Sequence, residues 1–392
     1  MLYIGIDVAS RKHDCCIIAG DGAVLRENII IKNNLEGFES LLSQIRSCPH
    51  KNNFSDVKIG LEATGHYNKN ITEFLRKHNL NVTVLNPLQV NLLQKADSLR
   101  KTRTDKSAAI FIAQMMFSRQ QPLKLPVSNE IDELRELVRH RSRLVEMSAK
   151  LKVSVCRLIS IVFPELPETV WSIHQKSAYA MLLEYPTAQA VAQSHMTKLC
   201  NLLHDNSKGR YGKQQAENIR DLARSSIGSS NPSYAFELQQ TIRLIQTLQS
   251  ESDLLDLRIK VIMDTLNSPI MTIPGISYRL GSVILAEIGN IHNFSNPNKL
   301  LKFAGLEPSV HESGTYKSTN EKMVKRGSKY LRWALLTASR LVAMRDPTFK
   351  AYSAKKKAEG KSFWVSYSHI ARKLVRVIFH LLKNNINFAP QT

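Results

Sequence analysis

Three acidic residues occupy positions that suit metal-ion chemistry. Asp7 lies within the apolar opening run LYIGIDVAS, Glu62 follows a short apolar run in KIGLEATGHY, and Asp105 lies in RKTRTDKSAA. A carboxylate among strand residues is costly to bury unless a positive charge compensates it. Carboxylates delivered by separate elements are typical ligands of Mg²⁺ or Mn²⁺ in phosphoryl transfer. The three acids therefore predict a divalent-metal site. The alternative is that Asp7 and Glu62 are ordinary turn or cap residues.

The elements around these acids predict a mixed sheet with helices. Asp21-Gly22 is a hairpin signal between the second and third strands. The order is three strands, helix, strand, helix, strand and helix, predicted at 2–9, 13–20, 24–31, 35–46, 58–64, 68–78, 81–87 and 88–116. That order is typical of a ribonuclease-H-like (RuvC-like) fold. In such a sheet the first and fourth strands are neighbours, so Asp7 and Glu62 are expected to converge on one or two Mg²⁺ ions.

The charge of the chain predicts a nucleic-acid partner. Among 392 residues, 54 are Lys or Arg and 33 are Asp or Glu, a formal charge of +21. The excess is spread over a long chain rather than confined to a tail, which favours nucleic-acid binding over a ribosome-associated or merely basic protein. Five cysteines without a CxxC pair, no signal peptide and no membrane-spanning run predict a reduced, cytoplasmic and nucleoid-associated protein of a bacterial or archaeal cell.

Two long helices with heptad seams are predicted in the middle of the chain. One seam places Leu137, Leu144, Leu151 and Leu158 seven residues apart, and the other contains Leu238, Ile245, Ile259 and Leu266. Ser148 and Ser252 interrupt the two seams. The helices are expected to form a coiled coil, either within one chain or also across subunits. We expect three domains, at 1–125, 126–268 and 269–392.

The C-terminal region carries three further candidates. Pro274-Gly275-Ile276 between helical runs resembles a helix-hairpin-helix, whose backbone N–H groups can hold a phosphate, although a tight packing turn is the alternative. Ser313-Gly314 lies in a predicted turn before a cationic stretch, where a serine can attack a phosphodiester. The basic residues predicted to bind nucleic acid are Arg100, Lys101, Arg103, Lys106, Lys317, Lys322, Lys325, Arg326, Lys329 and Arg332.

Taken together, these motifs resemble the DEDD-type insertion-sequence transposases, the insertion-sequence 110 family. The resemblance rests on GIDVASRKHD, GLEATGHY, RKTRTDKSAA and the C-terminal IPGIS, KFAGLEPSVHESGTYKST and KRGSKYLRWAL, in that order. It implies an N-terminal RuvC-like domain that holds Mg²⁺ (or Mn²⁺) and a mostly helical C-terminal transposase domain that supplies a serine. It also implies a site-specific recombinase guided by a non-coding bridge RNA on donor and target DNA, working as a homo-oligomer, a dimer to a tetramer.

The family pattern assigns roles to four residues and leaves one position unfilled. Asp7, Glu62 and Asp105 match the first three acids, and Ser313 matches the nucleophile that forms a covalent 5′-phosphoserine link to DNA. The fourth acid is expected three residues after Asp105, on the same helix face, where this chain has Ala108. Either three acids suffice or the chain is catalytically impaired, by nature or by deliberate substitution.

Two other functions remain open on the residues alone. A RuvC-like nuclease or junction resolvase would use water rather than Ser313. A non-catalytic nucleic-acid-binding scaffold would need no fourth acid, and Ala108 is the best argument for it.

Overall fold

The computed structural model describes residues 1–48, 56–62, 65–97, 105–118, 125, 127–309, 312–313, 316–317 and 323–390. The chain folds as two units, Met1–Leu125 and Pro126–Thr392. The predicted division of the second unit at residue 268 stays a prediction.

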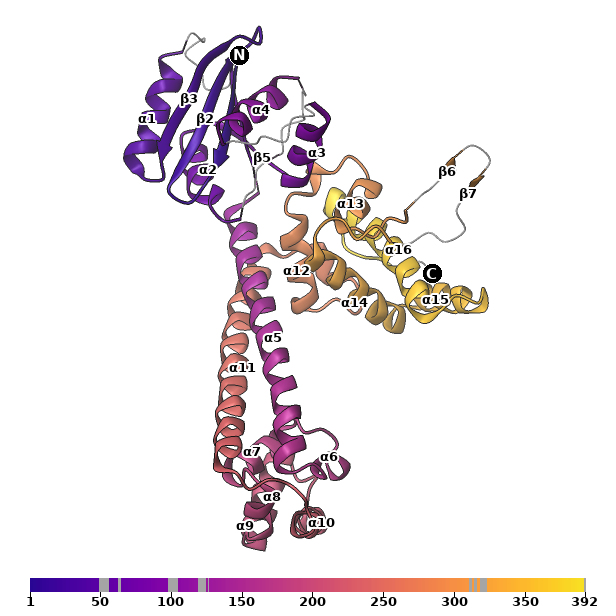
Figure 1. Cartoon of the computed structure of the whole chain (residues 1–392). Helices are drawn as coiled ribbons and strands as arrows, with labels where there is room; N and C mark the ends of the chain where they lie inside the picture. Colours follow the sequence, from indigo (N-terminus) through magenta and orange to yellow (C-terminus); the bar gives the residue numbers. More distant parts are fainter. Residues whose placement is uncertain are drawn as a thin grey trace. The chain divides into compact units, whose positions relative to one another are not determined.

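The first unit is built on a five-stranded mixed sheet in the order β3-β2-β1-β4-β5 (Figure 1). Its strands are β1 (Leu2–Val8), β2 (Lys12–Ala19), β3 (Val24–Lys32), β4 (Val57–Glu62) and β5 (Asn81–Leu85). The first three form an antiparallel meander, and β1–β4 and β4–β5 are parallel. Gly22 has a φ of +92° between β2 and β3, which a glycine adopts without strain. The predicted hairpin, strand order and β1–β4 pairing are confirmed, and the helical region predicted at 88–116 contains two helices, Pro87–Asp97 and Asp105–Ser118.

Helices cover both faces of this sheet. The helices are α1 (Leu35–Arg46), α2 (Asn68–Lys77), α3 (Pro87–Asp97) and α4 (Asp105–Ser118). Strand side chains alternate between faces with a period of two. Leu2, Ile4 and Ile6 therefore pack in one core with Leu41 and Ile71 of α1 and α2. The opposite face contributes the residues of a second core, Tyr3, Cys16 and Ile18, which pack with Ala109, Ile112, Ala113 and Met116 of α4.

In the second unit, two long helices lie side by side, α5 (Asn129–Val162) and α11 (Pro232–Leu266) (Figure 1). Ion pairs join Arg258 to Glu133 and Arg157 to Glu237, so the helices run antiparallel. The predicted seams face one another: Leu144, Leu158, Leu238, Ile245 and Ile259 are buried. The two helices pair within one chain, whereas a coiled coil in the strict sense stays a prediction.

Short helices form a separate core at one end of the α5–α11 pair (Figure 1). They are α6 (Leu166–Thr169), α7 (Lys176–Glu184), α8 (Ala188–Ala192), α9 (Met196–Ser207) and α10 (Lys213–Arg224). Their core includes Val155 and Leu158 of α5 and Leu238 of α11, so the bundle is anchored on both long helices.

The other end of the pair packs with the C-terminal helices. These are α12 (Tyr278–Ile288), α13 (Pro297–Ala304), α14 (Lys329–Arg345), α15 (Pro347–Ala358) and α16 (Phe363–Asn384), with 3₁₀ helices at Pro269–Thr272 and Ile291–Asn293. A two-stranded ladder joins β6 (Glu312–Ser313) to β7 (Tyr316–Lys317). The shared core contains Leu134 and Val138 of α5 and Ile259 and Met263 of α11.

None of the helices in the described ranges has the length and apolar character needed to cross a membrane. The structure forms no disulfide at any of the five cysteines, Cys15, Cys16, Cys48, Cys156 and Cys200.

Candidate functional site

Asp7 and Glu62 lie at the same level on neighbouring parallel strands. The β1–β4 ladder ends with Leu2 opposite Val57 at one end and Ile6 opposite Leu61 at the other. Asp7 and Glu62 are the next residue on each strand, so about one strand spacing, ~4.8 Å, separates their backbones. Glu62 is buried and Asp7 is half-buried. The sheet therefore brings together the first two of the predicted acids.

Both acids face the side of the sheet that α4 covers. Gly5 and Gly60 stand two residues before Asp7 and Glu62, and side chains two apart on a strand share a face. A Cβ at Gly5 would lie 2.1 Å from the carbonyl oxygen of Ala109, and one at Gly60 would lie 2.5 Å from Cγ of Met116. Only glycine lets α4 approach the sheet this closely. The close packing of α4 therefore depends on both glycines.

A third carboxylate on this face, Asp14, was missed by the sequence reasoning. Asp14 is directly opposite Asp7 in the antiparallel β1–β2 ladder, which places their Cβ atoms about 4.5–5.5 Å apart on one face. It is only 7% exposed, and its Oδ2 lies 3.7 Å from Nζ of Lys12. The available signal was an acid directly before a continuous apolar run, in the strand KHDCCIIA.

The third predicted acid, Asp105, is the first residue of α4. Its side chain lies outside the described residues, as does that of Lys106; Arg100, Lys101 and Arg103 lie outside them entirely. Ala108, one turn further along, is buried at 1% exposure, and its neighbour Ala109 contacts β1 at Gly5. The fourth acid position of the family pattern thus lies in the packed first turn of α4.

The donor atoms at this edge suit a hard cation, although the described side chains do not complete a metal site. No set of three His, Cys, Asp or Glu side chains that could hold a metal ion occurs among the described residues. The acids that the strands do bring to one face offer only oxygen ligands, which Mg²⁺ prefers. Asp7 and Asp14 are like charges directly opposite each other, an arrangement that a bound divalent cation would stabilise. The residues therefore fit Mg²⁺ by donor chemistry.

The predicted nucleophile lies on the short ladder of the second unit. Ser313 is the last residue of β6 and pairs with Tyr316 of β7. Its backbone thus belongs to a small hairpin, as its place before a predicted turn suggests. The side chain of Ser313 lies outside the described residues, as do Gly314 and the side chain of Lys317.

Comparison with known proteins decides the family. A family model described as a transposase matches residues 4–164, and the model of the IS116/IS110/IS902 transposase family matches residues 267–354. These two matches together take in more than half of the chain. The chain belongs to the IS116/IS110/IS902 family of transposases.

Some relatives match along nearly the full length, and others match over a shorter segment. The pilin gene-inverting protein of Moraxella bovis is 24% identical over 387 residues, covering 98% of this chain and 97% of its own. A protein of insertion element IS116 of Streptomyces clavuligerus is 24% identical over 400 residues, covering 99% and 96%. The transposase for insertion sequence element IS1111A of Coxiella burnetii is 29% identical over 116 residues, covering 30% and 29%.

Within the C-terminal stretch that the family model matches, the basic residues have different surroundings. Lys325 and Arg326 are exposed. Lys329 pairs with Glu146 at 3.4 Å. Arg332 donates to the carbonyl oxygen of Lys325 at 2.9 Å, which ties α14 to the preceding loop. Lys322 lies outside the described residues. Nucleic-acid binding by these residues stays a prediction.

Gly275 in the same transposase stretch has an evident packing role. Its φ is +95°, and a Cβ would lie 2.9 Å from the backbone carbonyl of Leu341 in α14. Both facts demand glycine. The element before this turn is the 3₁₀ helix Pro269–Thr272, and α12 follows it. The helix-hairpin-helix and its phosphate contact stay predictions.

Proposed function

We propose that this protein is the transposase of an insertion sequence and that it cuts and exchanges DNA strands with a metal-bound acidic site and a serine nucleophile. The observation that carries the proposal is that Asp7 and Glu62 lie side by side on neighbouring parallel strands. The helix that covers this face of the sheet begins with Asp105. Carboxylates arranged in this way hold a divalent cation at a phosphodiester.

Asp7, Glu62 and Asp105 would hold Mg²⁺ or Mn²⁺. The bound ion supplies Lewis-acid stabilisation of the phosphoryl oxygens. The hydroxyl oxygen of Ser313 attacks the phosphorus of DNA, forms a phosphoserine bond to the 5′ end and releases a 3′ oxygen. The serine loses its proton, the 3′ oxygen gains one, and one ester bond replaces another. The exchange is therefore readily reversible, which strand exchange requires.

The proposal includes a homo-oligomer, a dimer to a tetramer, in which the acidic site of one subunit works with the serine of another. Exposed apolar side chains on α11 support it. Leu254, Leu257 and Val261 are all exposed and, at spacings of three and four, share one helix face. Surfaces of this kind are typical of subunit contacts.

The proposal also includes a bridge RNA as the guide for donor and target DNA. The family resemblance suggests it, and the formal charge of +21 suits polyanionic partners. No RNA-binding module is visible in the sequence.

Restoring the fourth acid provides the test. Ala108→Asp would place a carboxylate at a buried position in the first turn of α4, so the variant should be less stable without metal and should recover stability with Mg²⁺. The purified variant, with its co-purified RNA, Mg²⁺ and labelled DNA, should give more strand cleavage on a denaturing gel than the native protein. A protein–DNA adduct that disappears when Ser313→Ala is added would support the serine mechanism.

The gel also separates the two alternatives. Cleaved DNA ends without any adduct would favour a water-using nuclease and would leave Ser313 as a turn residue. Binding without cleavage under every metal condition, even in Ala108→Asp, would favour the non-catalytic scaffold. Unchanged cleavage would show that position 108 is not the missing ligand.

A further inference from the structure

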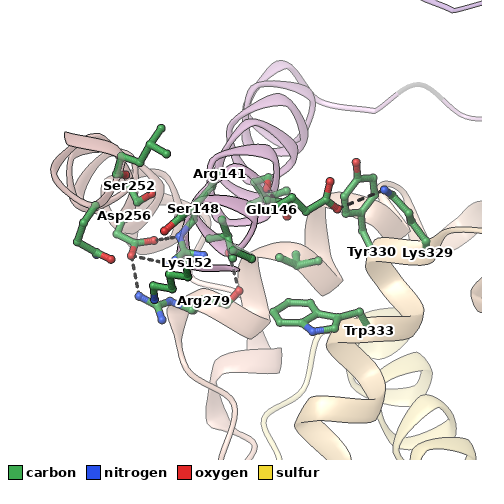
Figure 2. Close-up of a pocket in the computed structure, with 18 residues that line it drawn as sticks. Arg141, Glu146, Ser148, Lys152, Ser252, Asp256, Arg279, Lys329, Tyr330 and Trp333 are labelled. Carbon is green, nitrogen blue, oxygen red and sulfur yellow. Dashed lines mark hydrogen bonds and ion pairs between the residues drawn. The ribbon is translucent and has the colours of Figure 1, made fainter. Parts of the chain in front are cut away.

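A cavity of about 640 Å³ lies in the second unit, where α5, α11, α12 and α14 meet (Figure 2). Small-molecule sites in proteins typically occupy about 300–1,000 Å³. The cavity therefore has the size of a site for one nucleotide-sized ligand and is too small for a duplex.

The polar interruptions of the two heptad seams help to open this space. Ser148 and Ser252 line the cavity, at positions where the seams otherwise carry leucine, isoleucine or valine. Ser252 is buried, and its hydroxyl group donates to the carbonyl oxygen of Leu248 at 2.7 Å. The hydroxyl group of Ser252 thus has its hydrogen-bond acceptor within its own helix. Its small side chain leaves empty the space that a leucine or isoleucine would fill.

One side of the cavity carries more positive than negative charge. Asp256 accepts from Arg141 at 2.5 and 3.1 Å and from Arg279 at 2.9 Å, so two guanidinium groups share one carboxylate. Burial raises the pKa of Asp256, but the hydrogen bonds from both arginines outweigh burial and hold its pKa below the ordinary value. Lys152 also lines the cavity, and no described carboxylate lies within 4 Å of its ammonium group. An anion is therefore the favoured ligand.

An aromatic surface adjoins these cations. Trp333 of α14 lines the cavity and is 50% exposed. In Figure 2 its indole lies below the Lys329–Glu146 pair and to the right of Arg279. An accessible indole next to basic groups is the combination that binds single-stranded nucleic acid, because bases stack on the ring while cations attract the phosphate.

We propose that this cavity holds one unpaired nucleotide of a bound nucleic acid, with its base stacked on Trp333 and its phosphate next to Arg279 and Lys152. The inference rests on the proposed function only in that the protein must bind nucleic acid. It does not depend on Ser313, on the metal site or on strand cleavage. The same chemistry suits an RNA loop or an extruded DNA base, and the test distinguishes them.

The test uses the full-length protein and single-stranded oligonucleotides of identical sequence, one of RNA and one of DNA, each with a single 2-aminopurine. Stacking on Trp333 should quench the 2-aminopurine fluorescence on binding. Trp333→Ala should remove the quenching and weaken binding roughly tenfold or more, the usual effect of losing one stacked base. The nucleic acid that is quenched more strongly identifies the source of the unpaired nucleotide.

Matched variants separate stacking in the cavity from general effects. Trp364→Ala removes a 72% exposed tryptophan of α16 that does not line the cavity, and it should leave the quenching unchanged. Arg279→Gln should weaken single-strand binding, whereas Arg345→Gln at an exposed end of α14 should not. Duplex binding should be the same in the native protein and in Trp333→Ala.

Two kinds of result would contradict these proposals, and each contradicts a different one. Equal quenching in Trp333→Ala and native protein, or equal loss in Trp333→Ala and Trp364→Ala, would overturn the inference while leaving the proposed function intact. A native protein that binds neither single strands nor duplex would instead contradict the proposed function.

Discussion

In the first unit, the carboxylates of Asp7 and Asp14 stand opposite each other on β1 and β2; in the second, the carboxylate of Asp256 lies between Arg141 and Arg279. Both clusters are partly shielded from water. The first combines like charges across a ladder, which is unfavourable on its own. The second gives one anion two cationic partners. The carboxylates at the sheet edge favour a cation as ligand, whereas the two arginines at the cavity favour an anion.

A third cluster shows what a balanced arrangement looks like in the same molecule. Arg139 donates two hydrogen bonds to Glu287, at 2.7 and 3.1 Å, and Ser328 donates a third to Glu287 at 2.7 Å. The hydrogen bonds that Arg139 donates to Glu287 raise the pKa of Arg139 despite its partial burial. This cluster joins α5, α12 and the start of α14. Because its charges are paired and its hydrogen bonds made, its role is structural.

The largest expected effect comes from breaking that balanced pair. Glu287→Ala should lower the free energy of unfolding of the second unit by about 3–5 kcal/mol, because Arg139 would keep a partly buried charge without its partner. Urea unfolding followed by circular dichroism measures it. Glu146→Ala is the control, since its pair with Lys329 is exposed and should contribute less than about 1 kcal/mol. Equal effects in the two variants would show that burial does not distinguish the clusters.

A smaller effect on stability is expected at acid pH from Asp256, which lies between Arg141 and Arg279 at the cavity. The pKa of Asp256 is below its ordinary value in the folded protein, so the unfolded chain binds its proton first as the pH falls. The stability that Asp256 contributes is thus present above the unfolded pKa and is lost as the pH falls through the lowered folded pKa. Between pH 6 and 3, Asp256→Asn should lose less stability than the native protein, by an amount on the order of 1 kcal/mol.

The control for this pH experiment is Asp221→Asn, whose carboxylate forms an exposed pair with Arg224 in α10. It should follow the native pH profile closely. Unfolding free energies from urea titrations at each pH give the comparison. An Asp256→Asn profile parallel to the native one would mean that the two arginines do not stabilise the charged carboxylate.

The sheet edge was largely predictable from sequence, because it depends on local patterns. Short apolar runs defined the strands, Asp21-Gly22 defined the hairpin, and the element order implied that β1 and β4 pair. Asp14 was missed because its role depends on register: only the β1–β2 ladder places it opposite Asp7. The residue opposite an acid in a strand cannot be predicted until the register of strand pairing is known.

The cavity was far less predictable. The heptad interruptions at Ser148 and Ser252 were visible in the sequence, but a polar residue in a seam does not by itself predict a cavity. The cavity also requires Arg279 and Trp333, which are more than 25 and 80 residues beyond Ser252 and arrive through the packing of α12 and α14. Contacts between elements distant in sequence leave no periodic signal. The proximity of Arg279 and Trp333 in one cavity could therefore not be inferred from the sequence.

The smallest expected effect is on stability at the sheet edge. It tests whether Asp14 belongs to a cation site or to a structural ion pair. Without divalent metal, Asp14→Asn should stabilise the protein by about 0.2–1 kcal/mol, because it removes a like charge opposite Asp7. With Mg²⁺ the sign should reverse, since the native protein gains stability from the bound ion as its concentration rises above the dissociation constant. Thermal unfolding with EDTA and with Mg²⁺ measures both.

Asp21→Asn supplies the control for this pair of measurements, because Asp21 is an exposed hairpin residue whose Oδ1 accepts from the backbone of Ala23, a bond that asparagine retains. It should respond to Mg²⁺ as the native protein does. If Asp14→Asn is destabilising in EDTA, the ion pair with Lys12 outweighs the repulsion by Asp7. The sheet edge would then resemble the balanced Arg139–Glu287 cluster, and the argument that the fold itself requires a cation there would fail. The reversal of sign between EDTA and Mg²⁺ is thus the observation that separates a ligand site from a structural ion pair.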